Sequence, residues 1–349
     1  MTIIVFGSIN IDLVATVPRL PIAGETLLGN DFFLSPGGKG ANQAVASARL
    51  GISTQMVGRV GADNFGAELV KNLQISGVQT NNIFIDKTVS SGVAVISVDV
   101  KGENQIIVIP GANKRVNHED IERLSHLLPT AKALLLQFEI PMSAVVAAAK
   151  AARNAQVKVI LDPAPAQNDV PDELYRLVDI ITPNEVEAGQ LVGFPVDGEE
   201  SAAKAAAVLL QKGVKNAIVK LGAKGVFCAT PEERFFIPAF AVQAVDTVAA
   251  GDAFNGGLAA ALSQGHSLRD CVIWGAAAGA LAATKLGAQP SLPDRVTFDA
   301  FLGEWGVGSG GVGDKGTRGT RGASAVRRFP PLRRLAWTRG TRGSGGDNN

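Results

Sequence analysis

Short, almost continuously apolar runs alternate with helical patterns along most of this chain of 349 residues. The apolar runs have the composition of buried strands and end at glycine, proline or polar residues; they are TIIVFG, STQMVGRVG, ALLLQFE, VKVILDPAP, VDIITPN and NAIVKLG. Between them, apolar spacing predicts helices over 41–50, 64–76, 141–154, 200–212 and 268–286. This alternation predicts an α/β fold with a mostly parallel sheet covered by helices on both faces. In such a sheet, ligands bind beyond the carboxyl ends of the strands.

Two stretches, 12–34 and 92–109, interrupt the alternation. Both have the period-two pattern and the turn residues of antiparallel hairpins. We expect them to form a small second sheet over the strand ends of the main sheet. The alternative is that they are edge hairpins of the main sheet.

Charge is distributed unevenly along the chain. The last 45 residues, 305–349, hold nine Lys and Arg but two Asp and Glu, which leaves 24 basic and 30 acidic residues in 1–304. The segment is rich in Gly, Arg and Ser, so we predict a disordered tail. A basic tail of this kind could touch RNA, but we favour a dispensable one. The mildly acidic body argues against nucleic acid as the main partner.

Neither a secretory signal nor a membrane-spanning segment is predicted. The N-terminus lacks a basic region before its apolar run, and no charge-free apolar window of about 18 residues occurs. Cys228 and Cys271 are far apart in the sequence, as expected for unpaired thiols in a reducing cytosol. We therefore expect a cytoplasmic protein.

A cluster of glycines, SPGGKGANQAVASARLG, opens the helical pattern after residue 38. It is not a Walker A loop, because Lys39 is followed by Gly40 and not by Ser or Thr. Nor does VFGSINID have the glycine spacing of a dinucleotide-binding turn. A Gly-Gly-Lys-Gly turn could instead hold a polar, uncharged ligand, with Asn42 as donor and acceptor. Taken alone, it could equally be an ordinary helix start.

A second cluster, DTVAAGDAFNGG, places an acid directly behind three small residues where a helical pattern begins. The free amides of a helix N-terminus attract anions, and small residues let a phosphate approach the backbone. Asp252 would then be placed to accept a proton from an attacking hydroxyl. An isolated acid in a first helical turn is more often only a favourable partner of the helix dipole.

Polar side chains also follow the predicted strands. Asn10 and Asp12 come after the first strand at period-two spacing, and Glu139 ends another. Such groups suit a sugar, since each hydroxyl needs a donor and an acceptor. Any one of them alone could be a solvated loop residue.

Taken together, these motifs resemble the ribokinase/fructokinase-like carbohydrate kinases over residues 3–302. The two signature regions are GGKGANQAVASARLG and DTVAAGDAFNGGLAAAL, supported by GSINIDLV, QFEIP, LDPAPA, TPNEVEA and KLGAKGV. The resemblance implies a three-layer α/β/α kinase domain over 1–304, with 12–34 and 92–109 as a small β lid. It also implies ATP-dependent phosphorylation of ribose at the 5-hydroxyl, and a homodimer formed through the lid.

The resemblance further implies a role for individual residues. Asp252 would be the general base, and the backbone of Gly251, Ala250 and Ala249 would stabilise the transferring phosphoryl group. The sugar would be held by Asn10, Asp12, Gly38, Lys39, Gly40, Asn42, Glu139 and Asp252. ATP and its Mg²⁺ would lie near Asn184, Glu187, Lys220, Gly222, Gly225, Gly251 and Ala276. A monovalent cation, usually K⁺, would be held by Asp246, Val248, Ala282, Lys285, Gly287 and Ser291.

Several positions depart from the family pattern. Ala249 stands where relatives often carry glycine, which is tolerable if its φ stays negative. Ala276 replaces a common asparagine against the adenine, and Val248 a common threonine. Phe32 and Phe33 are the aromatic residues of the lid segments, and we expect them in its core. Kinases for deoxyribose, fructose or adenosine, and a non-catalytic sugar-binding protein, remain alternatives.

Overall fold

The computed structural model describes residues 2–306, so 307–349, most of the predicted tail, lie outside the described residues. Residues 1–299 form one compact unit, and a second unit begins at Ala300. The strands of the main sheet are β1 (Thr2–Phe6), β4 (Ser53–Gly61), β5 (Val78–Asp86), β8 (Ala131–Leu136), β9 (Lys158–Leu161), β10 (Ile180–Ile181), β11 (Asn216–Lys220), β12 (Gly225–Ala229) and β13 (Arg234–Pro238). The helices are α1 (Lys39–Arg49), α2 (Asn64–Ile75), α3 (His118–Leu127), α4 (Met142–Asn154), α5 (Asp172–Leu177), α6 (Glu185–Val192), α7 (Glu199–Lys212), α8 (Ala250–Ser263), α9 (Leu268–Ala282) and α10 (Arg295–Glu304).

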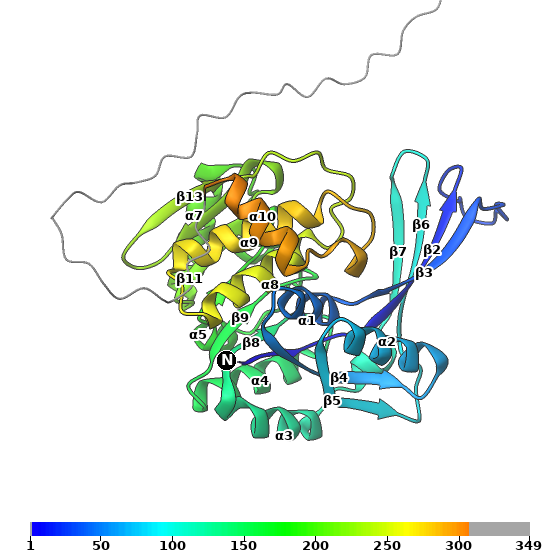
Figure 1. Ribbon diagram of the computed structural model, residues 1–349, viewed down its shortest axis with the longest axis horizontal. Helices are drawn as coiled ribbons and strands as arrows, with labels where there is room; N and C mark the ends of the chain where they lie inside the picture. The colour runs from blue at the N-terminus through cyan, green and yellow to red at the C-terminus, as the bar shows by residue number, and fades with distance from the viewer. Residues whose placement is uncertain (1, 307–349) are drawn as a thin grey trace, which may run out of the picture. The chain divides into compact units, whose positions relative to one another are not determined.

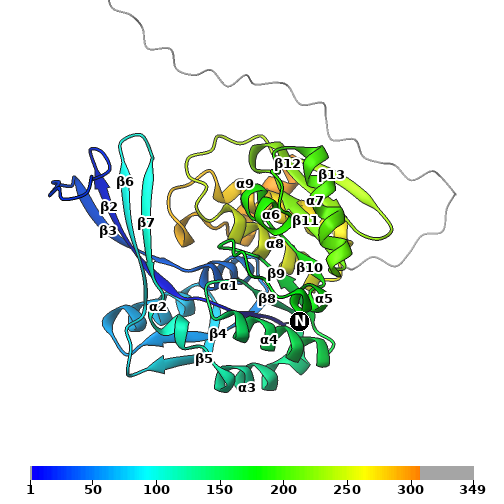
Figure 2. The same cartoon turned by 180° about the vertical axis from the view of Figure 1, so that it is seen from behind.

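The main sheet has the order β13-β12-β11-β10-β9-β8-β1-β4-β5, and Figure 1 labels several of its strands from β13 to β5. All pairs from β11 to β5 are parallel, while β12 and β13 add an antiparallel edge. Its central strands are apolar on both faces, and alternate residues of β1 serve opposite sides: Ile4 and Phe6 pack in the core beneath α3 and α4. The view from behind shows α3, α4 and α5 over one face and α1, α8 and α9 over the other (Figure 2). The predicted α/β fold is confirmed.

The predicted helices are present, with one boundary wrong. The last of them was expected to reach residue 286, but α9 ends at Ala282. The carbonyl of Ala283 accepts the amides of Val245 and Asp246 from a neighbouring loop, so it does not continue the helical ladder. No helix among residues 2–306 is long and apolar enough to span a membrane.

A separate four-stranded sheet stands apart from the main sheet, and we call it the small sheet (Figure 1). Its strands are, in spatial order, β3 (Asp31–Gly37), β2 (Asn10–Val17), β6 (Gly92–Asp99) and β7 (Asn104–Ile109). The two predicted hairpins are joined by parallel pairing of β2 with β6. The expectation that Phe32 and Phe33 form its core is wrong, since they are 58% and 47% exposed. No second layer of the described unit covers them.

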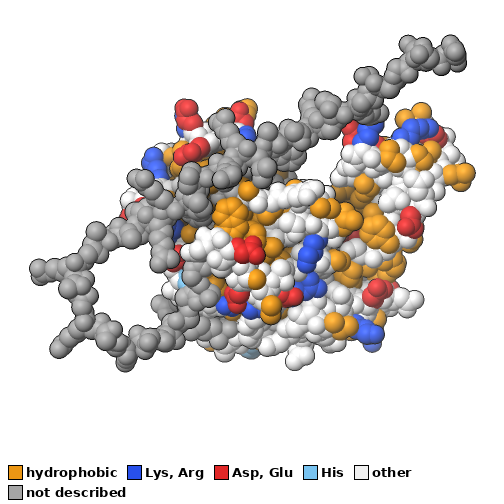
Figure 3. Space-filling model, turned by 45° about the horizontal axis from the view of Figure 1, so that its top comes forward, with side chains coloured by type: hydrophobic (Ala, Val, Ile, Leu, Met, Phe, Trp, Pro, Cys, Tyr) orange, Lys and Arg blue, Asp and Glu red, His pale blue; other side chains and the backbone are white. Residues whose placement is uncertain are grey.

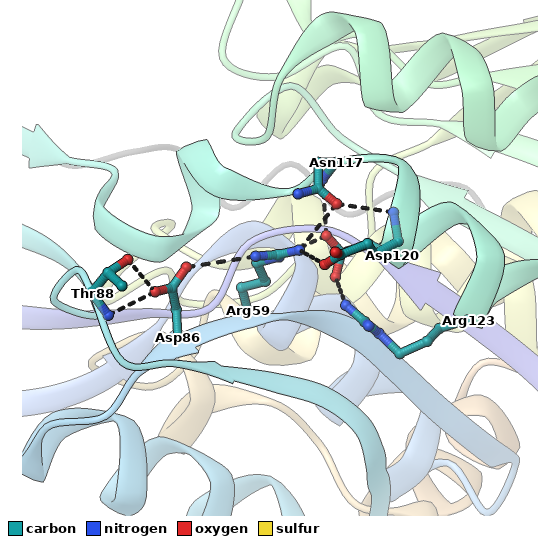
Figure 4. A network of polar contacts seen from close by, with 7 residues as sticks. Arg59, Asp86, Thr88, Asn117, Asp120 and Arg123 are labelled. Atoms are coloured by element: carbon teal, nitrogen blue, oxygen red, sulfur yellow. Dashed lines mark hydrogen bonds and ion pairs between the residues drawn. The ribbon is translucent and has the colours of Figure 1, made fainter.

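A network of polar contacts around Arg59, which is buried, joins the β4–β5 edge of the main sheet to α3 (Figure 4). Arg59 of β4 donates to Asp120 of α3 at 2.6 Å and lies 3.5 Å from Asp86 of β5. Asp86 also accepts two hydrogen bonds from Thr88, and Arg123 pairs with Asp120. Every charge is compensated, so the network fixes the ends of β4, β5 and α3 together.

Candidate functional site

The N-terminus of α1 is capped by a carboxylate from another strand end. Gly38 is its N-cap and has no side chain to cap the helix. Instead Glu139, which follows β8, accepts the amide of Lys39 at 3.0 Å and the hydroxyl of Ser8. Ser8 in turn accepts the amide of Gly40. The Glu139 carboxylate therefore takes the place of a capping side chain at the start of α1.

Asn10 and Asp12 project from β2 close to this turn. A Cβ on Gly38 would lie 2.7 Å from the amide nitrogen of Asn10, and one on Gly37 would lie 2.4 Å from an oxygen of Asp12. Asn10 is held by Asn113, whose Nδ2 donates to the Asn10 side-chain oxygen at 2.7 Å. Asn113 also pairs with the backbone of Ile9 in both directions, so its orientation is fixed.

Burial, together with the negative charges of Glu139 and Asp252, raises the pKa of Asp12 to about 7. Glu139 and Asp252 therefore act electrostatically on Asp12. Convergence of acids around a carboxyl group with a raised pKa is typical of functional sites.

Asp252 lies in the first turn of α8 and is 4% exposed. Both its oxygens are held by α1: Asn42 Nδ2 donates to Oδ2 at 2.8 Å and Gln43 Nε2 to Oδ1 at 3.1 Å. Burial is the main cause that raises the pKa of Asp252. The charge of Lys39 lowers the pKa and that of Asp162 raises it, and the net result is a pKa of about 6. An ionised carboxylate with this pKa suits a general base near neutral pH.

The Lys39 ammonium is surrounded by acids. Burial lowers its pKa, but the carboxylates of Asp252, Asp162, Glu139 and Glu187 outweigh this and raise it above the ordinary value. Lys39 is therefore a permanent cation among the four. The sequence assigned Lys39 to the sugar only through its turn, so this electrostatic role is an addition from the structure.

The small residues before Asp252 form a tight turn into α8. Ala249 is the N-cap with φ −104°, so the alanine there is unstrained, as the sequence required. The amide of Ala250 donates to the carbonyl of Thr247 at 3.1 Å and is already engaged. A Cβ on Gly251 would lie 3.4 Å from Lys220 Nζ. An ammonium group therefore lies beside the turn that was predicted to bind an anion.

The motif NEVE opens α6 as a capping box. Asn184 accepts the amide of Glu187 at 2.8 Å, and Glu187 Oε2 accepts the amide of Asn184 at 2.8 Å. The backbone of Asn184 also pairs with that of Lys220, at the end of β11, in an isolated parallel β-bridge. Burial and the charge of Asp162 raise the pKa of Glu187, whereas Lys220 lowers it. A buried carboxylate is a ligand type that suits Mg²⁺, which binds through few carboxylates, water and phosphates.

The predicted monovalent cation residues lie before α8 and from the end of α9 onward, and Asp246 joins these two segments. Its carboxylate accepts the amides of Val248 at 3.0 Å and Gly287 at 2.9 Å. Ala282 and Lys285 are linked by a backbone hydrogen bond of 3.2 Å, and Ser291 closes the following turn. Main-chain carbonyls with one carboxylate are hard oxygen donors, so the residue types fit K⁺.

Three further residues, Gly222, Gly225 and Ala276, were predicted to contact the nucleotide. Gly222 and Gly225 have positive φ values of 51° and 130° in the turn between β11 and β12, which requires glycine. Ala276 lies partly buried on α9, where neighbouring Gly275 packs on Phe254 of α8.

Four residues of the site were missed in the sequence: Ser8, Gln43, Gln137 and Asp162. Ser8, Gln137 and Asp162 follow β1, β8 and β9, which are neighbours in the sheet. The signal was therefore available, because polar residues at the carboxyl ends of adjacent parallel strands meet at one edge. Gln43 sits within the quoted glycine motif beside Asn42.

Comparison with known proteins decides the family. A model of the pfkB family of carbohydrate kinases matches residues 2–295. The chain belongs to the pfkB family of carbohydrate kinases. Among family members, a ribokinase of Haemophilus influenzae is 43% identical over 294 residues, covering 84% of this chain and 96% of the relative. A deoxyribokinase of Salmonella typhi is 36% identical over 302 residues, covering 86% and 99%.

The fold comparison agrees with the family. An Arabidopsis thaliana ribokinase solved with ribose and ATP is 36% identical and superimposes with a TM-score of 0.80, covering 86% of this chain and 98% of that one. The pfkB-family kinase described here thus carries the fold and both signature regions of the family.

Proposed function

We propose that this kinase transfers the γ-phosphoryl group of ATP to the 5-hydroxyl of D-ribose, giving ribose 5-phosphate and ADP. The observation that carries the proposal is the Asp252 carboxylate. It is buried at a helix start, fixed by the sugar turn through Asn42, and electrostatically coupled to Asp12. The ribokinase relatives and the ribose- and ATP-bound Arabidopsis ribokinase support ribose and ATP as the substrates.

In the proposed mechanism, Asn10, Asp12 and Glu139 bind the sugar hydroxyls. Asp252 accepts the proton of the 5-hydroxyl as the hydroxyl oxygen bonds to the γ-phosphorus. The bond between the γ-phosphorus and the oxygen that bridges it to the β-phosphate breaks, which releases ADP. The turn at Gly251 and the ammonium of Lys220 stabilise the transferring group. Lys39 keeps Asp252 ionised before the transfer.

We propose that Mg²⁺ and K⁺ assist the reaction. When bound with ATP, Mg²⁺ would neutralise phosphate charge, and Glu187 and Asn184 would hold it. K⁺ would supply a fixed positive charge, and the segments joined by Asp246 would hold it.

We also propose a cytosolic location, because both cysteines of the described residues are buried free thiols.

A coupled ADP-release assay with ribose, deoxyribose, fructose and adenosine, with and without K⁺, tests the proposal. We expect ribose to give the highest kcat/KM and K⁺ to increase it. Adenosine as the best substrate would make the protein a nucleoside kinase. Sugar binding without ADP release would favour a non-catalytic protein.

The pH dependence follows from Asp252. Its pKa is raised to about 6, and the base must be ionised, so activity should rise with pH through about 6. Below that value kcat/KM should fall about tenfold per pH unit. A kcat/KM profile from pH 4.5 to 8 on ribose measures this. A profile flat down to pH 4.5 would show that no group with a raised pKa controls turnover.

We propose that the small sheet pairs with the small sheet of a second copy. Its edge strands β3 and β7 expose apolar side chains, and in Figure 3 such side chains gather along the right of the molecule. The residues concerned are Phe32, Phe33, Leu34, Ile106, Ile107, Val108 and Ile109. Open edges and apolar patches of this kind mark interaction sites.

Replacing Ile107, which is 65% exposed, by aspartate should convert the dimer into a monomer in light scattering. Ile75 at the end of α2 is 76% exposed, so Ile75→Asp is the matched control and should remain dimeric. A monomeric unmodified protein would exclude the contact. A dimeric Ile107→Asp variant would place the contact on another surface.

A further inference from the structure

Gln43 is wholly buried, and the proposed mechanism gives it no role. Its Nε2 lies 3.1 Å from Asp252 Oδ1 and 3.0 Å from Asp162 Oδ2. Its Oε1 accepts Gln137 Nε2 at 2.7 Å. One amide group therefore stands between two buried carboxylates, with its own oxygen already engaged.

The chemistry of an amide fits this position. The NH₂ group has two hydrogens, so it can donate one to each carboxylate. The hydrogen bond from Gln137 fixes which end of the Gln43 amide faces the acids, because a flipped amide would place its oxygen against both carboxylates. An amide also carries no charge and does not titrate, so it separates the acids at every pH.

The contacts continue past Asp162 to the phosphoryl site. Asp162 Oδ1 pairs with Lys220 Nζ at 3.0 Å, and that ammonium lies beside Gly251. A continuous series of contacts thus leads from Asp252 through Gln43, Asp162 and Lys220 back to the turn before Asp252. The charged groups that act on Asp252 from neighbouring elements are Lys39, Asp162 and Asp12, with Lys220 paired to Asp162.

We propose that Gln43 is a positioning residue, which orients the Asp252 carboxylate with one amide hydrogen and holds Asp162, and through it Lys220, with the other. The inference rests on the proposed function only in naming Asp252 as the base. Gln43 itself need not touch sugar or nucleotide. By donating to both carboxylates, Gln43 stabilises Asp252 and Asp162 next to each other in one buried site. It also connects Asp252 through Asp162 to Lys220, the cation beside the phosphoryl group.

Gln43→Leu tests the first half of the proposal. Leucine is of similar size but donates nothing, so Asp252 loses one of its two hydrogen bonds. Losing a donor to a carboxylate raises its pKa, by about one unit for a charge-assisted bond. The acidic limb of kcat/KM should therefore move up by about one pH unit. At pH 8, kcat should recover toward the unmodified value more than at pH 6.

Asp162→Asn should produce the opposite shift. It is nearly isosteric and removes the negative charge that raises the pKa of Asp252, so the acidic limb should move to lower pH. The control is Ser47→Ala, one turn further along α1, since Ser47 is buried and bonds to the carbonyls of Gln43 and Gly256 without touching either acid. It should leave the profile unchanged. If Gln43 acted only through packing, the acidic limbs of Gln43→Leu and Asp162→Asn would not move in opposite directions.

A titration without substrate separates this inference from the proposed function. The Asp252 carboxyl carbon can be followed by NMR in protein labelled with ¹³C-aspartate, and assigned by its loss in Asp252→Asn. We expect its pKa to rise in Gln43→Leu and fall in Asp162→Asn, whichever sugar the enzyme prefers. If Gln43→Leu does not fold, Asp162→Asn and Gln137→Leu decide, and the latter should shift the pKa upward by less. An unmoved Asp252 pKa in the folded variants would overturn the inference, whereas failure to phosphorylate ribose would overturn only the proposed function.

Discussion

Asp252→Asn should reduce kcat on ribose by about 10²–10⁴-fold, the usual contribution of a general base, and leave ribose binding within a few-fold. The fold should survive, because the new amide can be accommodated. Asn42 Oδ1 is buried without a hydrogen-bond partner among the described residues, so Asn42 can flip to accept from the new NH₂ while Gln43 keeps donating to its oxygen. Turnover by ADP release and ribose affinity by calorimetry measure the two effects separately.

Asp270→Asn is the matched control for this variant. Asp270 is also an acid in a first helical turn, that of α9, but it lies partly exposed and bonds to Ser267. Its replacement should leave turnover unchanged. Equal losses of binding and turnover in Asp252→Asn would mean that Asp252 is structural.

Gly38→Ala should lower kcat/KM for ribose by about a hundredfold, as expected when a binding group moves by about 1 Å. Gly38 has φ 89°, and an added Cβ would lie 2.7 Å from the backbone nitrogen of Asn10. Backbone cannot yield as a flexible side chain would, so α1 must move away from β2. Asn10 and Asn42 would then no longer face one sugar. Strain at this φ should also cost about 1–3 kcal/mol of the free energy of unfolding.

Gly51→Ala separates strain from damage to the site. Gly51 follows the other end of α1 with φ 84°, and nothing lies within 4 Å of its added Cβ. Denaturant unfolding should show a loss of about 1–2 kcal/mol, with kcat/KM unchanged. If both variants lost activity equally, the loop before α1 would have no special part in sugar binding.

The fold was largely predictable because the buried strands carry their own signal. The central strands are apolar on both faces, and the helices between them keep one apolar side, so local pattern and final position agree. The exposure of Phe32 and Phe33 could not be predicted from pattern alone. Aromatic residues in alternating strands normally pack, and only the isolation of the small sheet leaves them uncovered.

The site was predicted better as a set of motifs than as a set of contacts. Asp252 and Asn42 were identified by residue type, and the structure brings them within 2.8 Å although 210 positions separate them. The partner that holds the other oxygen, Gln43, was missed because a glutamine on a helix carries no pattern of its own. Similarly, the amide of Ala250 bonds to Thr247, a detail of turn geometry that small residues do not encode.

The most direct test is a crystal structure of the kinase with ribose and a non-hydrolysable ATP analogue. We predict an Asp252 carboxylate oxygen at hydrogen-bond distance, about 2.6–3.2 Å, from the ribose 5-oxygen. The γ-phosphate should lie against the turn at Gly251 with Lys220 beside it. An Asp252 side chain that faces away from the 5-oxygen, with ribose and nucleotide both bound, would contradict the account.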